Sequence, residues 1–129
     1  MSKKQFYVQF SRDIFIFSYL CAGINFSDIA NLKLCNLIDN KLVYIRKKTK
    51  KKINTPLSNE ALQIIQKYSL GRAKTNDYIF PILDSIAHKT ELQRFNRIHK
   101  VFGKINPALK KVAKLVGINV NLTTYVIKH

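Results

Sequence analysis

The hydrophobic pattern of this 129-residue sequence changes its period twice, near Asn36 and again near Ser58. Outside that segment, apolar residues recur every three to four positions, a spacing typical of helices. Inside it, apolar residues stand in short alternating runs, and the pair Asp39-Asn40 has the composition of a hairpin turn. Pro56 restricts the last of these runs to the edge of a sheet. We therefore predict a mainly α fold with one small antiparallel β-sheet.

The first half of the chain is expected to form two helices and the strands of the sheet. Ser11 is the expected N-cap of the first helix, and Gly23 is its expected stop. Apolar residues lie on nearly every side of this helix, which is typical of a buried, central element. Ser27 then caps a short helix over 28–33, and the strands lie within 36–57.

The second half of the chain is expected to form two more helices. Ser58 caps the first of them, which ends at Gly71, and the apolar run 78–81 then anchors a loop. Thr90 opens the longest helix, whose apolar positions repeat at intervals of three and four. These positions are Leu92, Phe95, Ile98, Phe102 and Ile105. Pro107 should kink or break this helix because proline removes a backbone donor.

The charge balance restricts the partners of the chain. Lys and Arg number 23 against seven Asp and Glu, so the formal net charge is +16, while 47% of the residues are hydrophobic. Self-repulsion of this size destabilises a globular chain, so we predict a polyanionic partner, and double-stranded DNA is the first candidate. An anionic membrane is the alternative, but the most apolar stretch, 14–21, is too short to span one. We therefore expect no membrane association.

The cysteines, histidines and glycines indicate neither a metal site nor a small-molecule cofactor. Cys21 and Cys35 lie among apolar neighbours and are expected to be buried free thiols in a reducing cytoplasm. The histidines at 88, 99 and 129 are scattered, and no Cys/His pair has the spacing of zinc ligands. The four glycines form no phosphate-binding loop. We predict a cytoplasmic protein that needs no metal and no cofactor.

One stretch, from Phe17 to Lys33, combines several features of a known pattern. Gly23 ends a helix, Asn25 follows two residues later, and Asp28 opens a short helix that ends in Leu-Lys. The stretch resembles the first signature box of the tyrosine recombinases, the phage-integrase family, in which an arginine stands at the position of Asn25. Its amino-acid sequence is most similar to those of integrases from Bacteroides-like mobile elements.

Two further stretches resemble the same family at fitting distances along the chain. The predicted strands and turn within 36–57 match the family hairpin that carries a catalytic lysine, and Lys48 falls at the family spacing. The last residues, 124–129, resemble the second box and begin a final helix. Tyr125 stands there at a histidine position, and Lys128 stands at the position of a second arginine.

The resemblance implies a metal-free phosphoryl transfer in which DNA is cut and rejoined through a 3′-phosphotyrosine. Arginines and histidines of the family neutralise the negative charge of the transition state. The planar guanidinium group of an arginine donates hydrogen bonds to two phosphate oxygens at once. Lys48 would protonate the 5′-oxygen leaving group; its alternative role is that of a solvated turn charge. Neighbouring basic residues are expected to contact DNA phosphates. These are Arg46, Lys47, Lys50, Lys51 and Lys52.

Departures from the family pattern imply that the chain is inactive alone. Asn25 carries no charge. Lys128 keeps the positive charge of arginine but lacks its planar guanidinium group. The third box and the nucleophilic tyrosine are missing from the match, so residues 1–129 are interpreted as a single partial catalytic domain. Asn25 has a second interpretation, as a residue that simply initiates a helix.

The missing part of the family domain would pack on the first and longest helices. Without it, their apolar faces should remain partly uncovered and favour self-association.

Three hypotheses for the function of the chain follow from these features. We expect a DNA-binding fragment of a site-specific recombinase from a mobile element. The alternative is a non-catalytic, regulatory DNA-binding module on the same scaffold. A third hypothesis, a basic RNA-associated protein, predicts aromatic side chains exposed on a sheet for base stacking. The alternation around Tyr44 instead predicts a half-buried strand residue, which disfavours that third hypothesis.

Overall fold

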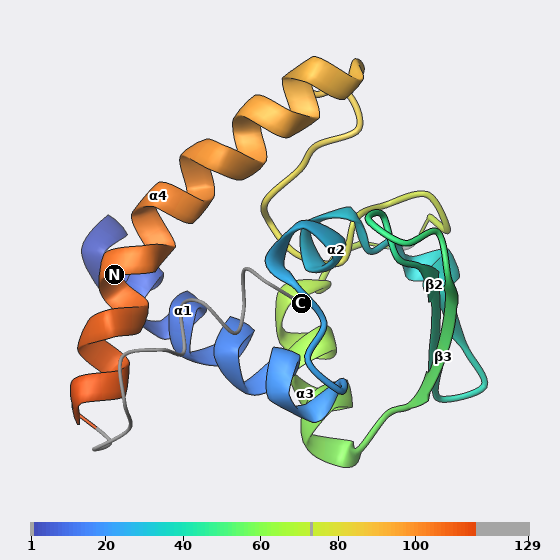
Figure 1. Cartoon of the computed structure of the whole chain (residues 1–129), viewed down its shortest axis with the longest axis horizontal. Helices are drawn as coiled ribbons and strands as arrows, with labels where there is room; N and C mark the ends of the chain where they lie inside the picture. The colour runs from blue at the N-terminus through green and yellow to red at the C-terminus, as the bar shows by residue number, and fades with distance from the viewer. Residues whose placement is uncertain (1, 73, 116–129) are drawn as a thin grey trace.

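The computed structural model describes residues 2–72 and 74–115, with the backbone alone at 108, 109 and 111–115 (Figure 1). The helices are α1 (Lys3–Leu20), α2 (Phe26–Asn31), the 3-10 helix η1 (Leu34–Asn36), α3 (Asn59–Tyr68) and α4 (Glu91–Leu115). The strands are β1 (Leu37–Ile38), β2 (Lys41–Ile45) and β3 (Lys52–Pro56). The fold is mainly α with a small antiparallel sheet, as the change of period predicts.

The sheet has the strand order β1-β2-β3, and both pairs of neighbours are antiparallel. Asp39 and Asn40 join β1 to β2 with φ angles of +50° and +61°, values that suit a tight hairpin turn. Pro56 ends β3, which is an edge strand and can therefore accommodate a residue without a backbone donor. Leu42 and Tyr44 of β2 are buried, so one face of the sheet packs on the helices.

The first helix begins much earlier than the sequence suggested. Ser2 is its N-cap and forms a capping box with Gln5, whereas Ser11 lies in the middle of α1. The hydroxyl of Ser11 is buried and donates to the carbonyl oxygen of Tyr7 within the helix. The prediction of a Ser11 cap was wrong because a serine hydroxyl can also bond to the preceding helical turn. The helix ends at Leu20, and Gly23 terminates it as predicted, since Gly23 has a φ of +80° and its amide donates to the carbonyl oxygen of Ser18 at 2.8 Å.

Two predictions of burial in the first half of the chain were also wrong. One side of α1 is exposed, since Ile16 and Tyr19 keep 37% and 69% of their accessible surface. Cys21 is buried, and burial raises the pKa of its thiol to about 12, but Cys35 is exposed. Apolar neighbours in sequence did not bury these side chains, because no element described here covers that side of α1 or Cys35.

Aromatic side chains from distant segments form the centre of the core. Phe80 lies with its ring centroid 5.1 Å from that of Phe17, 5.7 Å from Tyr68 and 6.4 Å from Phe10. The loop that carries Phe80 is held by a hydrogen bond of 3.0 Å from the Ile79 amide to the carbonyl oxygen of Leu32. The predicted apolar anchor at 78–81 is confirmed for Tyr78, Ile79 and Phe80, which are buried, while Pro81 is partly buried.

The long helix α4 packs on α1 along part of its length. Ile98, Val101 and Ile105 are buried, and the predicted start at Thr90 is confirmed by a hydrogen bond of 3.1 Å from the Gln93 amide to the threonine hydroxyl. Pro107 lies inside the helix, so the predicted break does not occur. Burial of Ile105 against α1 on the preceding turn supports the helix where the proline removes one backbone hydrogen bond.

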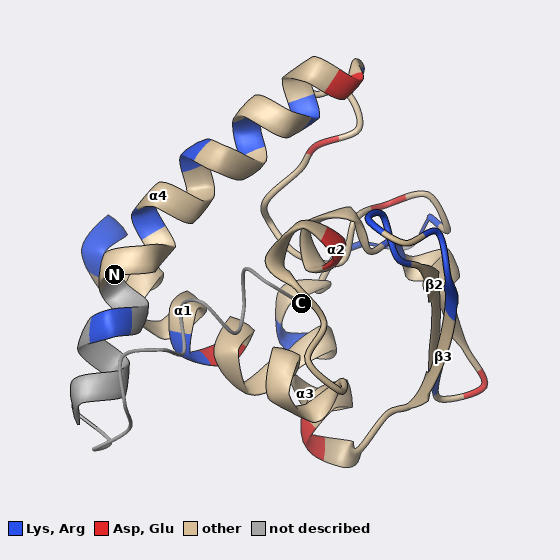
Figure 2. Cartoon of the chain, viewed as in Figure 1, with Lys and Arg blue, Asp and Glu red and all other residues tan. Residues whose placement is uncertain are grey.

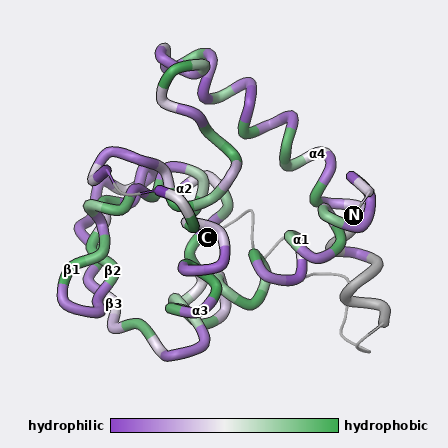
Figure 3. Tube along the Cα trace, turned by 180° about the vertical axis from the view of Figure 1, so that it is seen from behind, coloured by the Kyte–Doolittle hydropathy of each residue, from purple (hydrophilic) through white to green (hydrophobic). Residues whose placement is uncertain are grey.

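The first turns of α4 extend beyond the body of the molecule (Figures 1 and 3). Leu92 and Phe95 on these turns are 67% and 54% exposed, although their spacing predicted a place in the core. The sheet stands at one end of the molecule and α1 with α4 at the other, with α2 between them. The predicted start of a last helix at 124–129 lies outside the described residues.

Candidate functional site

A closed basic turn connects β2 to β3. The Arg46 amide donates to the carbonyl oxygen of Lys51, and the Lys50 amide donates to the carbonyl oxygen of Arg46, both at 2.8 Å. Lys50 adopts a φ of +59°, a left-handed conformation that lets the chain reverse direction. Lys48 lies at the tip of this turn and is exposed, and Figure 2 shows the turn in the blue of Lys and Arg. The turn therefore presents several positive charges to solvent from a defined backbone.

The beginning of α2 is capped by the residue at the first family position. The Asn25 side-chain oxygen accepts the Asp28 amide at 2.8 Å, and Asn25 itself is buried. The structure thus confirms the interpretation of Asn25 as a helix-initiating residue. The predicted cap at Ser27 was wrong: Ser27 lies inside α2, and the helix spans 26–31 rather than 28–33. Asparagine is among the preferred N-cap residues, so either polar side chain suited the local pattern.

The carboxylate of Asp28 connects α2 to the basic turn. Its Oδ1 accepts the Lys47 amide at 3.1 Å, across 19 positions of sequence. Asp28 is only 4% exposed, so this bond forms away from bulk solvent. The bond fixes the root of the turn beside the N-terminus of α2. The position of Asn25 and the turn that carries Lys48 are therefore held next to each other.

Charged and polar groups around Asp28 are incompletely paired. Neither its Oδ2 nor the Nε of Arg46 has a hydrogen-bond partner among the described residues, and both atoms are buried. Burial raises the pKa of the Asp28 carboxyl, and the nearby charges of Arg46 and Lys47 offset only part of that rise. Burial likewise raises the pKa of Tyr44, again against the opposing effect of Arg46. The site thus keeps a buried acceptor on Asp28 and a buried donor on Arg46 without partners among the described residues.

The predicted site residues fall into three groups. Lys47, Lys48 and the run 50–52 are exposed on the turn and its flank, and Arg46 is half-buried at its root. Asn25 lies beneath them as a helix cap. Tyr125 and Lys128 lie outside the described residues.

Asp28 is the residue that sequence reasoning passed over as part of the site. The sequence pattern identifies it only as the residue that opens a short helix. The signal that pointed to it was an acidic residue three positions after a polar cap, in a chain with seven acidic residues in all.

Other parts of the described chain offer less specific chemistry. Lys100 and Lys104 are exposed on α4, and basic positions recur along this helix in Figure 2. Within residues 2–72 and 74–115, no three His, Cys, Asp or Glu side chains come together as a metal site would need. In the same ranges, no helix is long and apolar enough to cross a membrane. The turn and its Asp28 support remain the best-defined candidate site.

Comparisons with known proteins identify the family of the chain. No curated protein and no solved structure gives a match to the chain. A family model described as the phage integrase family matches residues 10–129, which include α2, the basic turn and the end of the chain. The matched region is nearly the whole sequence and holds all three stretches that resemble the tyrosine recombinases. The chain belongs to the phage integrase family.

Proposed function

We propose that this chain binds duplex DNA through the turn between β2 and β3, as part of the catalytic domain of a site-specific recombinase from a mobile element. The observation that carries the proposal is the hydrogen bond from the Lys47 amide to Asp28. It holds a cluster of exposed cations in one place, where a duplex phosphate backbone can contact several of them together. Because the backbone of the turn is already ordered, binding costs less backbone conformational entropy than it would for cations on a mobile segment.

The family reaction assigns distinct roles to four residues of this chain. In the proposed complex, Lys48 protonates the 5′-oxygen that leaves when the phosphodiester bond is cut. Asn25, Tyr125 and Lys128 occupy the positions whose usual residues neutralise the transition-state phosphate. Lys128 supplies charge but not paired guanidinium hydrogen bonds, and Asn25 supplies no charge. Each missing donor lowers the rate by about 100- to 1000-fold, so we propose little or no cleavage by this chain.

A salt titration tests DNA binding at the turn. Lys50, Lys51 and Lys52 are replaced together by alanine, and affinity for a labelled duplex is measured by fluorescence anisotropy at several salt concentrations. Each phosphate contact contributes about 0.9 to the slope of log affinity against log salt. The triple variant should therefore bind more weakly at low salt, with a slope flatter by roughly two to three units.

A matched control separates contact with DNA from overall charge. Lys3 and Lys4 of α1 and Lys110 of α4 are exposed, and replacing them by alanine removes the same amount of charge. Both helices lie at the end of the molecule away from the sheet (Figure 1). The slope of this control should fall by less than about one unit. Equal slopes for the two triple variants would show that the turn does not lie on DNA.

One observation favours the second candidate, a regulatory DNA-binding module without catalysis. The side-chain oxygen of Asn25 is already bonded to the Asp28 amide, and the residue is buried. Asn25 therefore acts as a cap in this fold and offers a phosphate no cation. A nicked suicide duplex tests this absence of catalysis, since a catalytic chain forms a covalent adduct that persists on a denaturing gel. An adduct at the rate normal for a recombinase would rule out the regulatory candidate.

We also propose that the chain self-associates weakly through apolar side chains that α1 and the sheet leave exposed. These are Ile16, Tyr19, Ile38 and Ile45. The net charge of +16 opposes contact between copies, and salt screens that repulsion. Self-association should therefore strengthen with salt, whereas DNA binding weakens. Sedimentation equilibrium measures this dependence, and a clean monomer at every salt concentration contradicts the proposal.

A further inference from the structure

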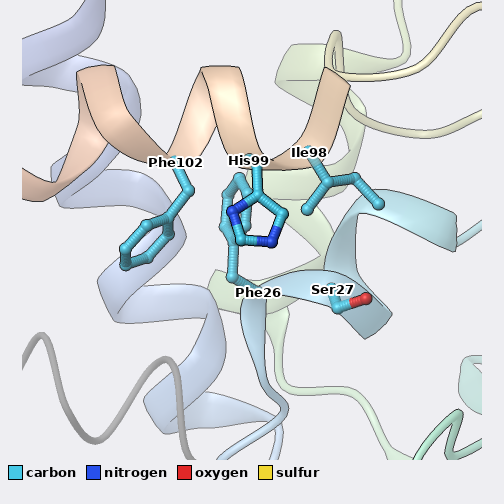
Figure 4. A pocket seen from close by; sticks show the side chains of 5 residues that line it. All are labelled: Phe26, Ser27, Ile98, His99 and Phe102. Carbon is cyan, nitrogen blue, oxygen red and sulfur yellow. The ribbon is translucent and has the colours of Figure 1, made fainter. Parts of the chain in front are cut away.

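The side of α4 that faces α2 forms one wall of an apolar groove. Between α2 and α4 lies a hollow of about 150 Å³, which Figure 4 shows from close by. Its lining residues are Phe26, Ser27, Ile98, His99 and Phe102. The rings of Phe26 and Phe102 lie 5.4 Å apart and form its floor. Nothing in residues 2–72 and 74–107 covers the hollow, so its apolar lining is available to a partner.

The groove continues along α4 as a regular stripe. Leu92, Phe95, His99 and Phe102 follow one another at intervals of three, four and three residues, and Leu92 and Phe95 are mostly exposed. The rings of Phe95 and His99 lie 4.4 Å apart, so the stripe is continuous between the two helical turns. This spacing is the one by which a helix presents a seam to a second helix.

Gly103 borders the stripe on the side away from α2. A side-chain carbon placed there would meet nothing within 4 Å in the described structure. Glycine within an exposed helix costs about 1 kcal/mol relative to alanine, and no contact within the described chain requires it. A bare backbone at this border lets a second helix approach α4 closely.

The charges around the stripe decide which helix fits. Glu91 is the first residue of α4, and positions 92–115 contain no acidic residue. Lys100 and Lys104 are exposed beyond Gly103. A second copy of this chain would bring the same lysines against one another. A DNA backbone complements the lysines but leaves the leucine and phenylalanine side chains in water.

We propose that this groove docks an amphipathic helix of another protein, one whose apolar face is bordered by acidic residues. Its apolar side chains cover Leu92 and Phe95 and enter the hollow beside Phe26, and its carboxylates lie near Lys100 and Lys104. This is recognition of a helix in a groove through anchors spaced three and four residues apart. The surface is separate from the basic turn, so the partner and DNA bind the same chain together.

The test uses the full chain and a defined probe. The probe is a fluorescent helical peptide of about three heptads, with leucine at the seam positions and glutamate beside them. A scrambled peptide of the same composition has the same charge but no apolar face. Anisotropy should show that the helical peptide binds at least about tenfold more tightly than the scrambled one, and that Phe95→Ser weakens it about tenfold. Phe95 is exposed, so this variant keeps its fold.

Further variants separate docking at the groove from attraction by charge alone and from dimerisation. The triple replacement of Lys50, Lys51 and Lys52 by alanine should leave peptide affinity within about twofold, while Lys100→Glu should weaken it. Equal affinity for both peptides would mean that charge alone attracts them, and the proposal would be wrong. It would also be wrong if Phe95→Ser left peptide affinity unchanged. Sedimentation that shows a dimer of this chain, lost in Phe95→Ser, would assign the groove to a second copy instead.

Discussion

The basic turn and the outer side of α4, which carries Leu92 and Phe95, are both exposed, but they differ in what they offer a partner. The turn concentrates charge on a short segment with little apolar surface, and a single buried carboxylate, that of Asp28, holds its root. The outer side of α4 displays Leu92 and Phe95 on a rigid helix and carries its charges beside them. The first surface suits a partner that offers many charges, and the second suits one that offers apolar area.

Both surfaces depend on the same core, so a substitution in that core should have the largest effect on stability and binding. Phe80 is fully buried among the rings of Phe10, Phe17 and Tyr68. Replacing it with alanine should lower the free energy of unfolding by about 3–5 kcal/mol, because the packed rings would leave a cavity. Denaturant unfolding measures the loss, and binding to DNA and to the helical peptide should fall together. Loss of one activity with full retention of the other would show that the two surfaces do not share this support.

The second largest loss of stability is expected when the hydrogen bond that supports the turn is removed. Asp28→Asn keeps an oxygen that accepts the Lys47 amide, whereas Asp28→Ala leaves that amide without its partner. The alanine variant should be less stable than the asparagine variant by about 1–3 kcal/mol, which denaturant unfolding measures. Similar stabilities would mean that the turn does not depend on this bond.

The same pair of variants predicts a dependence on pH. Burial raises the pKa of Asp28, so the folded state holds this proton more tightly than the unfolded state does. The stability from this preference is present at pH values below the ordinary carboxyl range and is lost as pH rises through the raised pKa. Asp28→Asn should therefore be more stable than the natural chain at neutral pH. The advantage should disappear as pH falls, in unfolding curves recorded from neutral to acidic pH.

A smaller effect should distinguish a cap from a DNA contact. Asn25→Ala removes the acceptor of the Asp28 amide and should cost about 1 kcal/mol, while Asn25→Ser retains a capping oxygen and most of the stability. If capping is the sole role of Asn25, duplex affinity should be equal in the serine variant and the natural chain. A serine variant that is fully stable yet binds DNA more weakly would assign Asn25 a direct contact.

The smallest effect is expected on the outer side of α4. Phe95→Ser should change the free energy of unfolding by less than about 0.5 kcal/mol, since more than half of this side chain is already exposed. Ile98→Ala, three residues later and buried, should cost about 2–5 kcal/mol. Thermal unfolding compares the two. A large loss in Phe95→Ser would mean that this face packs on the chain itself.

Much of the local structure was predictable because its causes are local. Asp39 and Asn40 form the expected hairpin turn, and Ser58 caps α3 by accepting the Ala61 amide at 3.2 Å. The exposed basic turn followed from a run of cations between two strands. Caps and tight turns depend on residues within about four positions of one another. The sequence alone therefore determined the fold class, the order of most elements and the cationic part of the candidate site.

Only the tertiary structure decided which surfaces are covered and which distant groups meet. The apolar spacing in α4 predicts burial for Leu92 and Ile98 alike. Only Ile98 is buried, because α1 and α2 reach only part of the helix. Asp28 meets the Lys47 amide because the sheet folds back against α2. Hydrophobic spacing identifies a face but does not identify what will cover it. Burial and long-range hydrogen bonds depend on the relative positions of whole elements, which no short stretch of sequence contains.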